Sequence, residues 1–329
     1  MPIPLSILDL AFVAAQQSPR DAFAGCLRIA QLAERLGYHR IWYAEHHNIA
    51  RIASSATSVL IAHIAAHTQT IRLGAGGIML PNHAPLIIAE QFGTLASLHP
   101  DRIDLGLGRA PGTDPATSRA LRIHPTESNA FPEDVLELQG YLGDESVVPG
   151  IDAIPGKGTH VPLYILGSSL FGASLAARLG LPYAFASHFA PSALEEAVAN
   201  YRREFRPSRQ LAIPYVIAGI NVIASDTAED AHAQFLAVQR WRVKALLGRG
   251  AGGDEWTDEQ AQEILDSPSG RPVKAMTTYS AVGTPSDVRA YVERFARKAD
   301  ADELMVVHPS PTLDARLRSI ELLRGAMAA

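Results

Sequence analysis

The sequence contains little cysteine, no long apolar run and no long run of one charge. Its single cysteine, Cys26, excludes an internal disulfide framework and suits a reducing cytoplasm. No stretch of about 18 uncharged apolar residues is present, so we expect no membrane span. The 29 basic and 34 acidic residues give a formal charge of -5 without a basic cluster. Neither nucleic acid nor an anionic membrane surface is therefore an expected partner.

Several short motifs with a defined chemistry are also missing. There is no cysteine cluster and no pair of histidines one helical turn apart with a glutamate, so we expect no metal site. The stretch from Gly167 to Leu170 lacks the second glycine of a nucleophile elbow. The glycine-rich stretch 106–112 does not have the spacing of a dinucleotide-binding loop. These absences argue against a metalloenzyme, a serine hydrolase and a Rossmann nucleotide site.

What the sequence does contain is an alternation of strand-like and helix-like segments. The segments Ser18–Asp21 and Thr284–Asp287 each have a capping hydroxyl, a proline at the first helical position and an acid in the first turn. Eight buried strands are expected, at 5–10, 40–44, 71–80, 103–108, 162–167, 183–187, 215–224 and 303–307. This alternation predicts a single (β/α)8 TIM barrel over residues 1–329. A doubly wound sheet is the alternative, because closure of a sheet is not visible in a sequence.

Two longer segments interrupt the alternation, after the fourth and seventh strands. Residues 111–158 are poor in strand signals, with one helix expected around 132–141. Residues 247–281 are polar and rich in glycine and proline. A long segment of this kind often covers an active site, so we expect a mobile insert or lid there.

A carboxylate and two imidazoles, Glu45, His46 and His47, follow the second predicted strand. The carboxyl ends of barrel strands carry the chemistry of α/β barrels. Neighbouring residues of a strand point to opposite sides, so His46 and His47 cannot both face one cavity, and a structural role is favoured for His47. Glu45 either orients an imidazole or pairs with a surface cation. His188, after the sixth strand, either touches substrate or caps a helix.

Other strand ends carry groups that suit a flat, phosphorylated ligand. Gly76 and Gly77 interrupt the third strand, where glycine marks either close approach of a ligand or relief of crowding. Arg109 ends the fourth strand and either holds a phosphate or forms a surface salt bridge. Ser168 and Ser169 precede a helix, where free backbone N–H groups attract anions and serine is also an ordinary cap.

In this order, these segments resemble the bacterial luciferase-like flavin monooxygenases over nearly the whole chain. The matching stretches are Ala44–His47, Gly74–Pro81, Arg102–Arg109, Leu166–Ser169 and Val282–Pro285. The likeness extends to uncharacterised bacterial members with the sequence Leu-Pro-Asn-His, which is found here at 80–83. The resemblance implies an α/β barrel, in agreement with the strand pattern, and a homodimer formed through the helices that follow the second and third strands.

The resemblance also implies roles for individual residues. His46 would be the catalytic histidine beside the flavin, with Glu45 next to it. Gly76 and Gly77 would lie against the isoalloxazine ring, often through a non-proline cis peptide bond. The other cofactor-binding residues that it implies are Gly108, Arg109, Leu166, Gly167, Ser168 and Ser169, with Arg109 and Ser169 at the FMN phosphate.

The reaction that the resemblance implies uses reduced FMN from a separate NAD(P)H-dependent flavin reductase. Oxygen would react at the C4a carbon, and the C4a-peroxyflavin would oxygenate a small organic substrate. Gly108 and Ser168 replace a cysteine and a glutamate of luciferases, so light emission is not implied. The alternatives are F420-dependent hydride transfer on the same fold and a flavin-binding protein without turnover.

Overall fold

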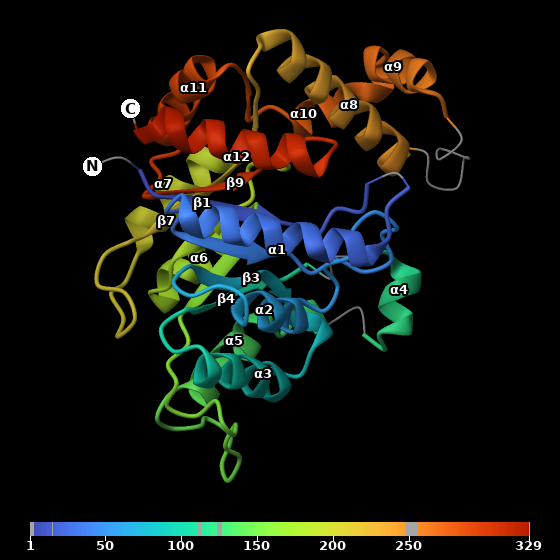
Figure 1. The fold of residues 1–329 in the computed structure, drawn as a ribbon. Coiled ribbons are helices and arrows are strands. Elements are labelled where there is room, and N and C mark those ends of the chain that lie inside the picture. The colour runs from blue at the N-terminus through green and yellow to red at the C-terminus, as the bar shows by residue number, and fades with distance from the viewer. Residues whose placement is uncertain (1–2, 15, 111–112, 124–126, 248–255, 329) are drawn as a thin grey trace.

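Eight parallel strands form a closed barrel (Figure 1). The computed structural model describes residues 3–14, 16–110, 113–123, 127–247 and 256–328. The barrel runs from β1 to β7 in chain order and continues to β9, which pairs with β7 and β1 and so closes the ring. Its strands are β1 (Leu5–Asp9), β2 (Arg40–Tyr43), β3 (Arg72–Met79), β4 (Ile103–Gly108), β5 (Leu163–Gly167), β6 (Tyr183–Phe185), β7 (Val216–Ala224) and β9 (Glu303–Val307). The predicted (β/α)8 barrel is confirmed, and the doubly wound alternative is wrong.

A further strand, β8 (Ser280–Gly283), lies outside the barrel. It pairs in parallel with the last residues of β7, where Asn221 lies opposite Ser280 and Ala224 opposite Gly283. The sequence pattern does not predict β8, because the strand has four residues and begins inside the polar segment 247–281. A strand this short has too few alternating positions to stand out from a loop.

Helices surround the barrel and cover its outer face (Figure 1). They are α1 (Pro19–Arg35), α2 (Thr57–Ala65), α3 (Pro85–Leu98), α4 (Pro115–Ala120), α5 (Phe131–Leu142), α6 (Leu170–Leu179), α7 (Leu194–Glu204), α8 (Ala228–Leu247), α9 (Asp258–Asp266), α10 (Arg271–Met276), α11 (Pro285–Lys298) and α12 (Leu313–Ala328). As predicted, Ser18 and Thr284 cap α1 and α11. No helix in the described ranges is long and apolar enough to cross a membrane.

The described parts of the insertions after β4 and β7 contain short helices. The first contributes α4, a short 3-10 turn and α5. The described end of the second, residues 256–281, contains α9, α10 and the first half of β8, which the polar composition does not predict. Its helices pack Ala261, Leu265 and Val273 against Val243 of α8 in a small separate core. The other part of the expected lid, residues 248–255, lies outside the described residues.

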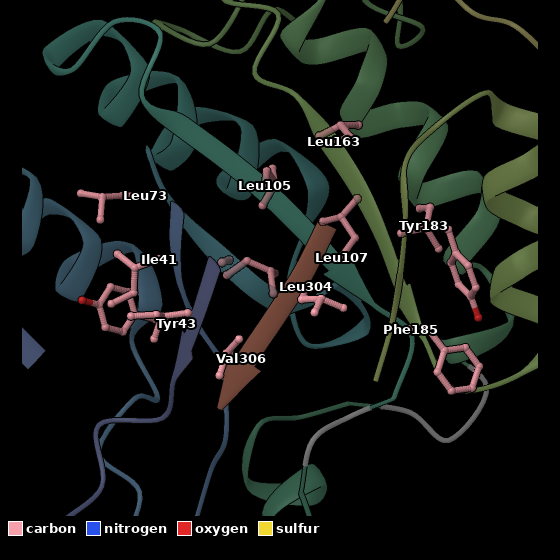
Figure 2. Close-up of a cluster of buried hydrophobic side chains, with 14 of the residues drawn as sticks. Ile41, Tyr43, Leu73, Leu105, Leu107, Leu163, Tyr183, Phe185, Leu304 and Val306 are labelled. Carbon is pink, nitrogen blue, oxygen red and sulfur yellow. The ribbon is translucent and has the colours of Figure 1, made fainter. Parts of the chain in front are cut away.

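Alternate residues of each strand face the helices and the barrel interior. On β4, Leu105 and Leu107 face the helices and belong to the main buried cluster, part of which Figure 2 shows. A second cluster, which includes Trp42, Tyr164 and Ile217, fills the interior of the barrel. The barrel is therefore a packed core rather than a pore, and a ligand can be received only at its ends.

Charged residues occupy the interior at the amino-terminal end of the barrel. Arg40 donates from Nε to Glu303 over 2.9 Å and from Nη1 to Asp104 and to the Tyr164 hydroxyl, each over 2.7 Å. All four side chains are buried. Because both carboxylates are paired inside the barrel, this end has a structural role, and the other end remains for chemistry.

Candidate functional site

The Glu45 segment lies in the loop after β2 and not in the strand itself. β2 ends at Tyr43, one residue earlier than the sequence indicates. The backbone N–H of Glu45 donates to the Gly77 carbonyl over 3.2 Å, and that of His46 donates to the Ser54 carbonyl over 3.3 Å. The strand alternation assumed for His46 and His47 therefore does not apply. The first of these bonds ties the loop to the glycine pair of β3.

The carboxylate of Glu45 is buried and accepts hydrogen bonds at both oxygens. Oε2 accepts from the Met79 backbone N–H over 3.0 Å, and Oε1 accepts from Asn82 Nδ2 over 2.9 Å. Nε2 of His47 lies 2.8 Å from Oε1, and Nε2 of His83 lies 3.0 Å from both oxygens. Glu45 thus holds together its own loop and residues 79–83 that follow β3.

This environment keeps Glu45 ionised. Burial alone would raise the pKa of the carboxyl group, but hydrogen bonds and charge from His83, together with bonds from His47 and Asn82, lower the pKa below its ordinary value. A carboxylate stabilised in this way is a poor proton donor. His47 is used in the same network, in line with the structural role predicted for it.

The glycine pair of β3 lies where the chain has no room for side chains. A Cβ atom on Gly76 would lie 2.9 Å from Leu8 and Trp42, and one on Gly77 would lie 2.7 Å from the Gly106 carbonyl oxygen and 3.1 Å from Leu166. The peptide bond between Gly76 and Gly77 is cis. Both glycines are therefore required by packing of the chain itself.

Arg109 and the start of α6 lie together at the ends of β4 and β5. The Arg109 guanidinium lies over the Phe171 ring, with Cζ 4.1 Å from the ring centroid. Within the described ranges no carboxylate forms an ion pair with Arg109, so the salt-bridge alternative is not observed. Ser169 stands at the N-cap of α6, but its side chain makes no capping hydrogen bond. An exposed cation therefore lies beside the uncapped N-terminus of a helix, a favourable place for an anion.

The other predicted cofactor residues lie around this point. Ser168 is exposed, and Leu166 and Gly167 are half-buried at the end of β5. A Cβ atom on Gly108 would lie 2.9 Å from the Met79 sulfur, which places Gly108 against the end of β3. The predicted residues of β3, β4 and β5 are thus brought to one side of the barrel mouth.

His188 lies across the mouth, over β7. A Cβ atom on Gly219 would lie 2.4 Å from His188 Nδ1, so the imidazole covers the inner side of β7. Nδ1 is buried without a hydrogen-bond partner among the described residues. Burial, with smaller contributions from Arg242 and His46, lowers the pKa of His188 to about 3. The imidazole is therefore neutral at neutral pH, and His46 lies close enough to influence it.

Four residues of the site are not found by the sequence reasoning. Asn82 and His83 belong to the stretch 80–83. This stretch resembles other members of the family, but the resemblance assigns no role to either residue. Asn221 donates from Nδ2 to the His188 carbonyl over 2.7 Å, and Arg242 of α8 reaches Asn221. No local signal marks them, because a single amide or guanidinium within a strand or helix acquires its role only from its neighbours in space.

Comparison with known proteins identifies the family. The family model described as luciferase-like monooxygenase matches residues 3–302. This chain belongs to the luciferase-like monooxygenase family. It is 48% identical over 322 residues to a luciferase-like monooxygenase of Escherichia coli K12, covering 97% of this chain and 96% of the relative. It is also 31% identical over 344 residues to the N-acetyl-S-alkylcysteine monooxygenase of Bacillus subtilis, covering 99% of both chains.

Solved structures share the barrel. The crystal structure of apo-MsnO8 has a TM-score of 0.88 and 34% identity, and the match covers 99% of this chain and 98% of MsnO8. More distant neighbours share the fold alone. They include a 3,6-diketocamphane monooxygenase of Pseudomonas putida in complex with FMN, with a TM-score of 0.73 and 17% identity over 98% of this chain and 97% of that one. An F420-dependent secondary alcohol dehydrogenase has a TM-score of 0.70 and 16% identity over 99% of both chains.

Proposed function

We propose that this oxidoreductase is an FMN-dependent monooxygenase that receives reduced FMN from an NAD(P)H-dependent flavin reductase and uses oxygen to oxygenate a small organic substrate. The observation that carries the proposal is the Arg109 guanidinium, which has no acidic partner in the described structure and lies beside the N-terminus of α6. A guanidinium and free backbone N–H groups together bind a phosphate well. Membership of the luciferase-like monooxygenase family favours FMN as the cofactor that carries this phosphate.

The residues present fit this cofactor. Arg109, Ser168 and Ser169 would hold the phosphate, and the flat ring would lie beside the backbone of Gly76 and Gly77, which carries no side chain. When bound, reduced FMN would supply the electrons that let one atom of oxygen enter the substrate.

The chain contributes binding, orientation and proton transfer. Glu45, which is saturated with hydrogen bonds, would act as a positioning residue that fixes the loop after β2. His46, carried on that loop, would move a proton to or from oxygen during turnover. This division refines the expectation that both residues act catalytically, since a fully occupied carboxylate has no free oxygen for substrate.

Cofactor binding gives the first test. Anaerobic titration of the apoprotein with reduced FMN and with reduced F420 should show tighter binding of FMN. Arg109→Gln should weaken FMN binding about 10- to 100-fold, because a charge-assisted hydrogen bond to a phosphate contributes about 1.5–3 kcal/mol. Arg178→Gln, at the other end of α6, is the matched control and should leave the affinity unchanged. Tighter binding of F420, or full FMN affinity in Arg109→Gln, would contradict the proposal.

Turnover separates an enzyme from a flavin-binding protein. With an NADH-dependent FMN reductase, NADH and a panel of small organic substrates, the protein should incorporate one atom of labelled oxygen into at least one of them. Mass spectrometry of the products measures the label. FMN binding without label in any product would favour a protein without turnover.

We also propose a homodimer through α2 and α3. Val59 on α2 exposes 68% of its surface, and Leu98 on α3 exposes 65%. Exposed apolar side chains gain free energy when a partner covers them. Sedimentation equilibrium should give about twice the 35.3 kDa of one chain. The double variant Val59→Asp, Leu98→Asp should be a monomer, whereas Ile213→Asp, at an exposed position outside these helices, should remain a dimer. A monomeric wild-type protein would contradict this arrangement.

A further inference from the structure

Arg242, in the last third of α8, is a half-buried cation without an acidic partner in the described part of the chain. Its only hydrogen bonds there are long, to the Met276 carbonyl over 3.4 Å and to Asn221 Oδ1 over 3.5 Å. Burial lowers the pKa of the guanidinium to about 10, and no described carboxylate offsets this. A half-buried charge that lacks a counter-ion is costly, so an anion that binds it gains much of its affinity from relieving that cost.

Strand alternation places this cation over the mouth of the barrel. Ile217 packs inside the barrel, so Gly219 and Asn221, two and four residues further along β7, face the same way. The Gly219 position is covered by the His188 imidazole. Asn221 donates to the His188 carbonyl and accepts from Arg242. Arg242 is thus tied to the inner edge of β7, beside His188.

The charges around this point favour an anion. His188 is neutral, and its low pKa reflects burial together with the positive charge of Arg242 and the nearby His46. No described aspartate or glutamate is among the groups that influence the pKa of either His188 or Arg242. An aromatic pair lies on the same helix, because Trp241 of α8 packs edge-on against Phe12, with 6.0 Å between ring centroids. An organic acid has a carboxylate that could bind Arg242 and an apolar part that could pack against aromatic side chains.

This cation is distinct from the one assigned to the flavin phosphate. Arg109 lies at the ends of β4 and β5, whereas Arg242 is tied to β7, on the other side of the mouth. One phosphate cannot account for both. We propose that Arg242 binds the carboxylate of the organic substrate, so that the enzyme acts on small organic acids. The inference rests on the proposed monooxygenase function and names the substrate class of that same site.

Matched pairs of ligands test it directly. The full-length protein, saturated with FMN, is titrated by calorimetry with hexanoate, benzoate and N-acetylalanine and with the amide of each. At least one acid should bind about tenfold or more tightly than its amide, because a charge-assisted hydrogen bond to a guanidinium is about twice as strong as a neutral one. If no acid is preferred over its amide, the proposal is wrong.

Variants of α8 locate the effect. Arg242→Gln should bind acid and amide alike, and Arg242→Lys should keep part of the preference. Arg240→Gln, on the same helix, loses a hydrogen bond from Nε to Gln262 over 2.9 Å and should keep the wild-type preference for acids. Thermal melting of each variant shows that it is folded. A preference for acids that survives in Arg242→Gln would overturn the proposal, as would a loss in Arg240→Gln of the same size.

Two further measurements separate this inference from the proposed function. Reduced FMN should bind Arg242→Gln as tightly as it binds the wild type. A selective loss of reduced FMN affinity, with carboxylate binding intact, would mean that the cation serves the flavin, and the proposal would fail. The acids are also titrated without FMN. If the protein binds acids through Arg242 but binds no FMN, the carboxylate site is supported and the proposed monooxygenase function is wrong.

Discussion

His46→Gln should lower the rate of substrate oxygenation about 100- to 10,000-fold, which is the usual contribution of a positioned proton-transfer group. Glutamine preserves the approximate length and hydrogen bonding of the side chain but cannot take up or release a proton at neutral pH. Oxygen consumption and product formation are measured with the reductase present. The expected result is that reducing equivalents still reach oxygen but leave as hydrogen peroxide, with little oxygenated product.

The controls separate chemistry from structure. His46→Gln should bind FMN normally and melt close to the wild-type temperature, since the His46 side chain is only half-buried. Glu45→Gln should instead lower thermal stability, because the buried carboxylate binds Met79, Asn82 and two histidines. His67→Gln, at the end of α2, should leave both properties unchanged. A His46→Gln variant that retains more than about half of the wild-type turnover would exclude proton transfer by His46.

Arg40→Met should reduce the free energy of unfolding by about 3–5 kcal/mol, the usual cost of removing one member of a buried ion pair. Arg40 is 3% exposed, and its partners Asp104 and Glu303 are fully buried. Burial alone would lower the pKa of Arg40, but Glu303 and Asp104 raise it above its ordinary value. Methionine fills much of the volume but leaves both carboxylates short of a counter-ion, with Arg72 still beside Asp104. Urea unfolding followed by circular dichroism measures the loss.

An exposed ion pair serves as the control for the Arg40→Met prediction. Arg289 and Glu293 on α11 are each 42% exposed and lie one turn apart, so Arg289→Met should cost less than about 1 kcal/mol. FMN affinity of the folded Arg40→Met protein should be unchanged, because the ion network and the proposed flavin site lie at opposite ends of the barrel. A loss of stability below about 1 kcal/mol in Arg40→Met would show that the buried network is replaceable by apolar contacts.

The barrel could be predicted from the sequence because each of its strands is a short buried run between helix-forming segments. The starts of α1 and α11 could also be predicted from Ser18 and Thr284, because a helix cap is a local interaction between residues three apart. The strand β8 and the helices α9 and α10 could not be predicted. Their apolar residues are few, and they become recognisable only where Val243 of α8 supplies the other half of a small core.

In the candidate site, too, some features could be predicted from the sequence and others could not. By itself the sequence determined the (β/α)8 class and the strand ends at which His46, Arg109 and Ser169 lie, because strand ends follow from local patterns of hydrophobicity. Only the tertiary structure showed that the Glu45 carboxylate is saturated with hydrogen bonds and that Arg242 of α8 reaches β7 without an acidic partner among the described residues. Hydrogen bonding, desolvation and charge pairing depend on neighbours tens of residues away in the chain, and folding alone brings those neighbours together.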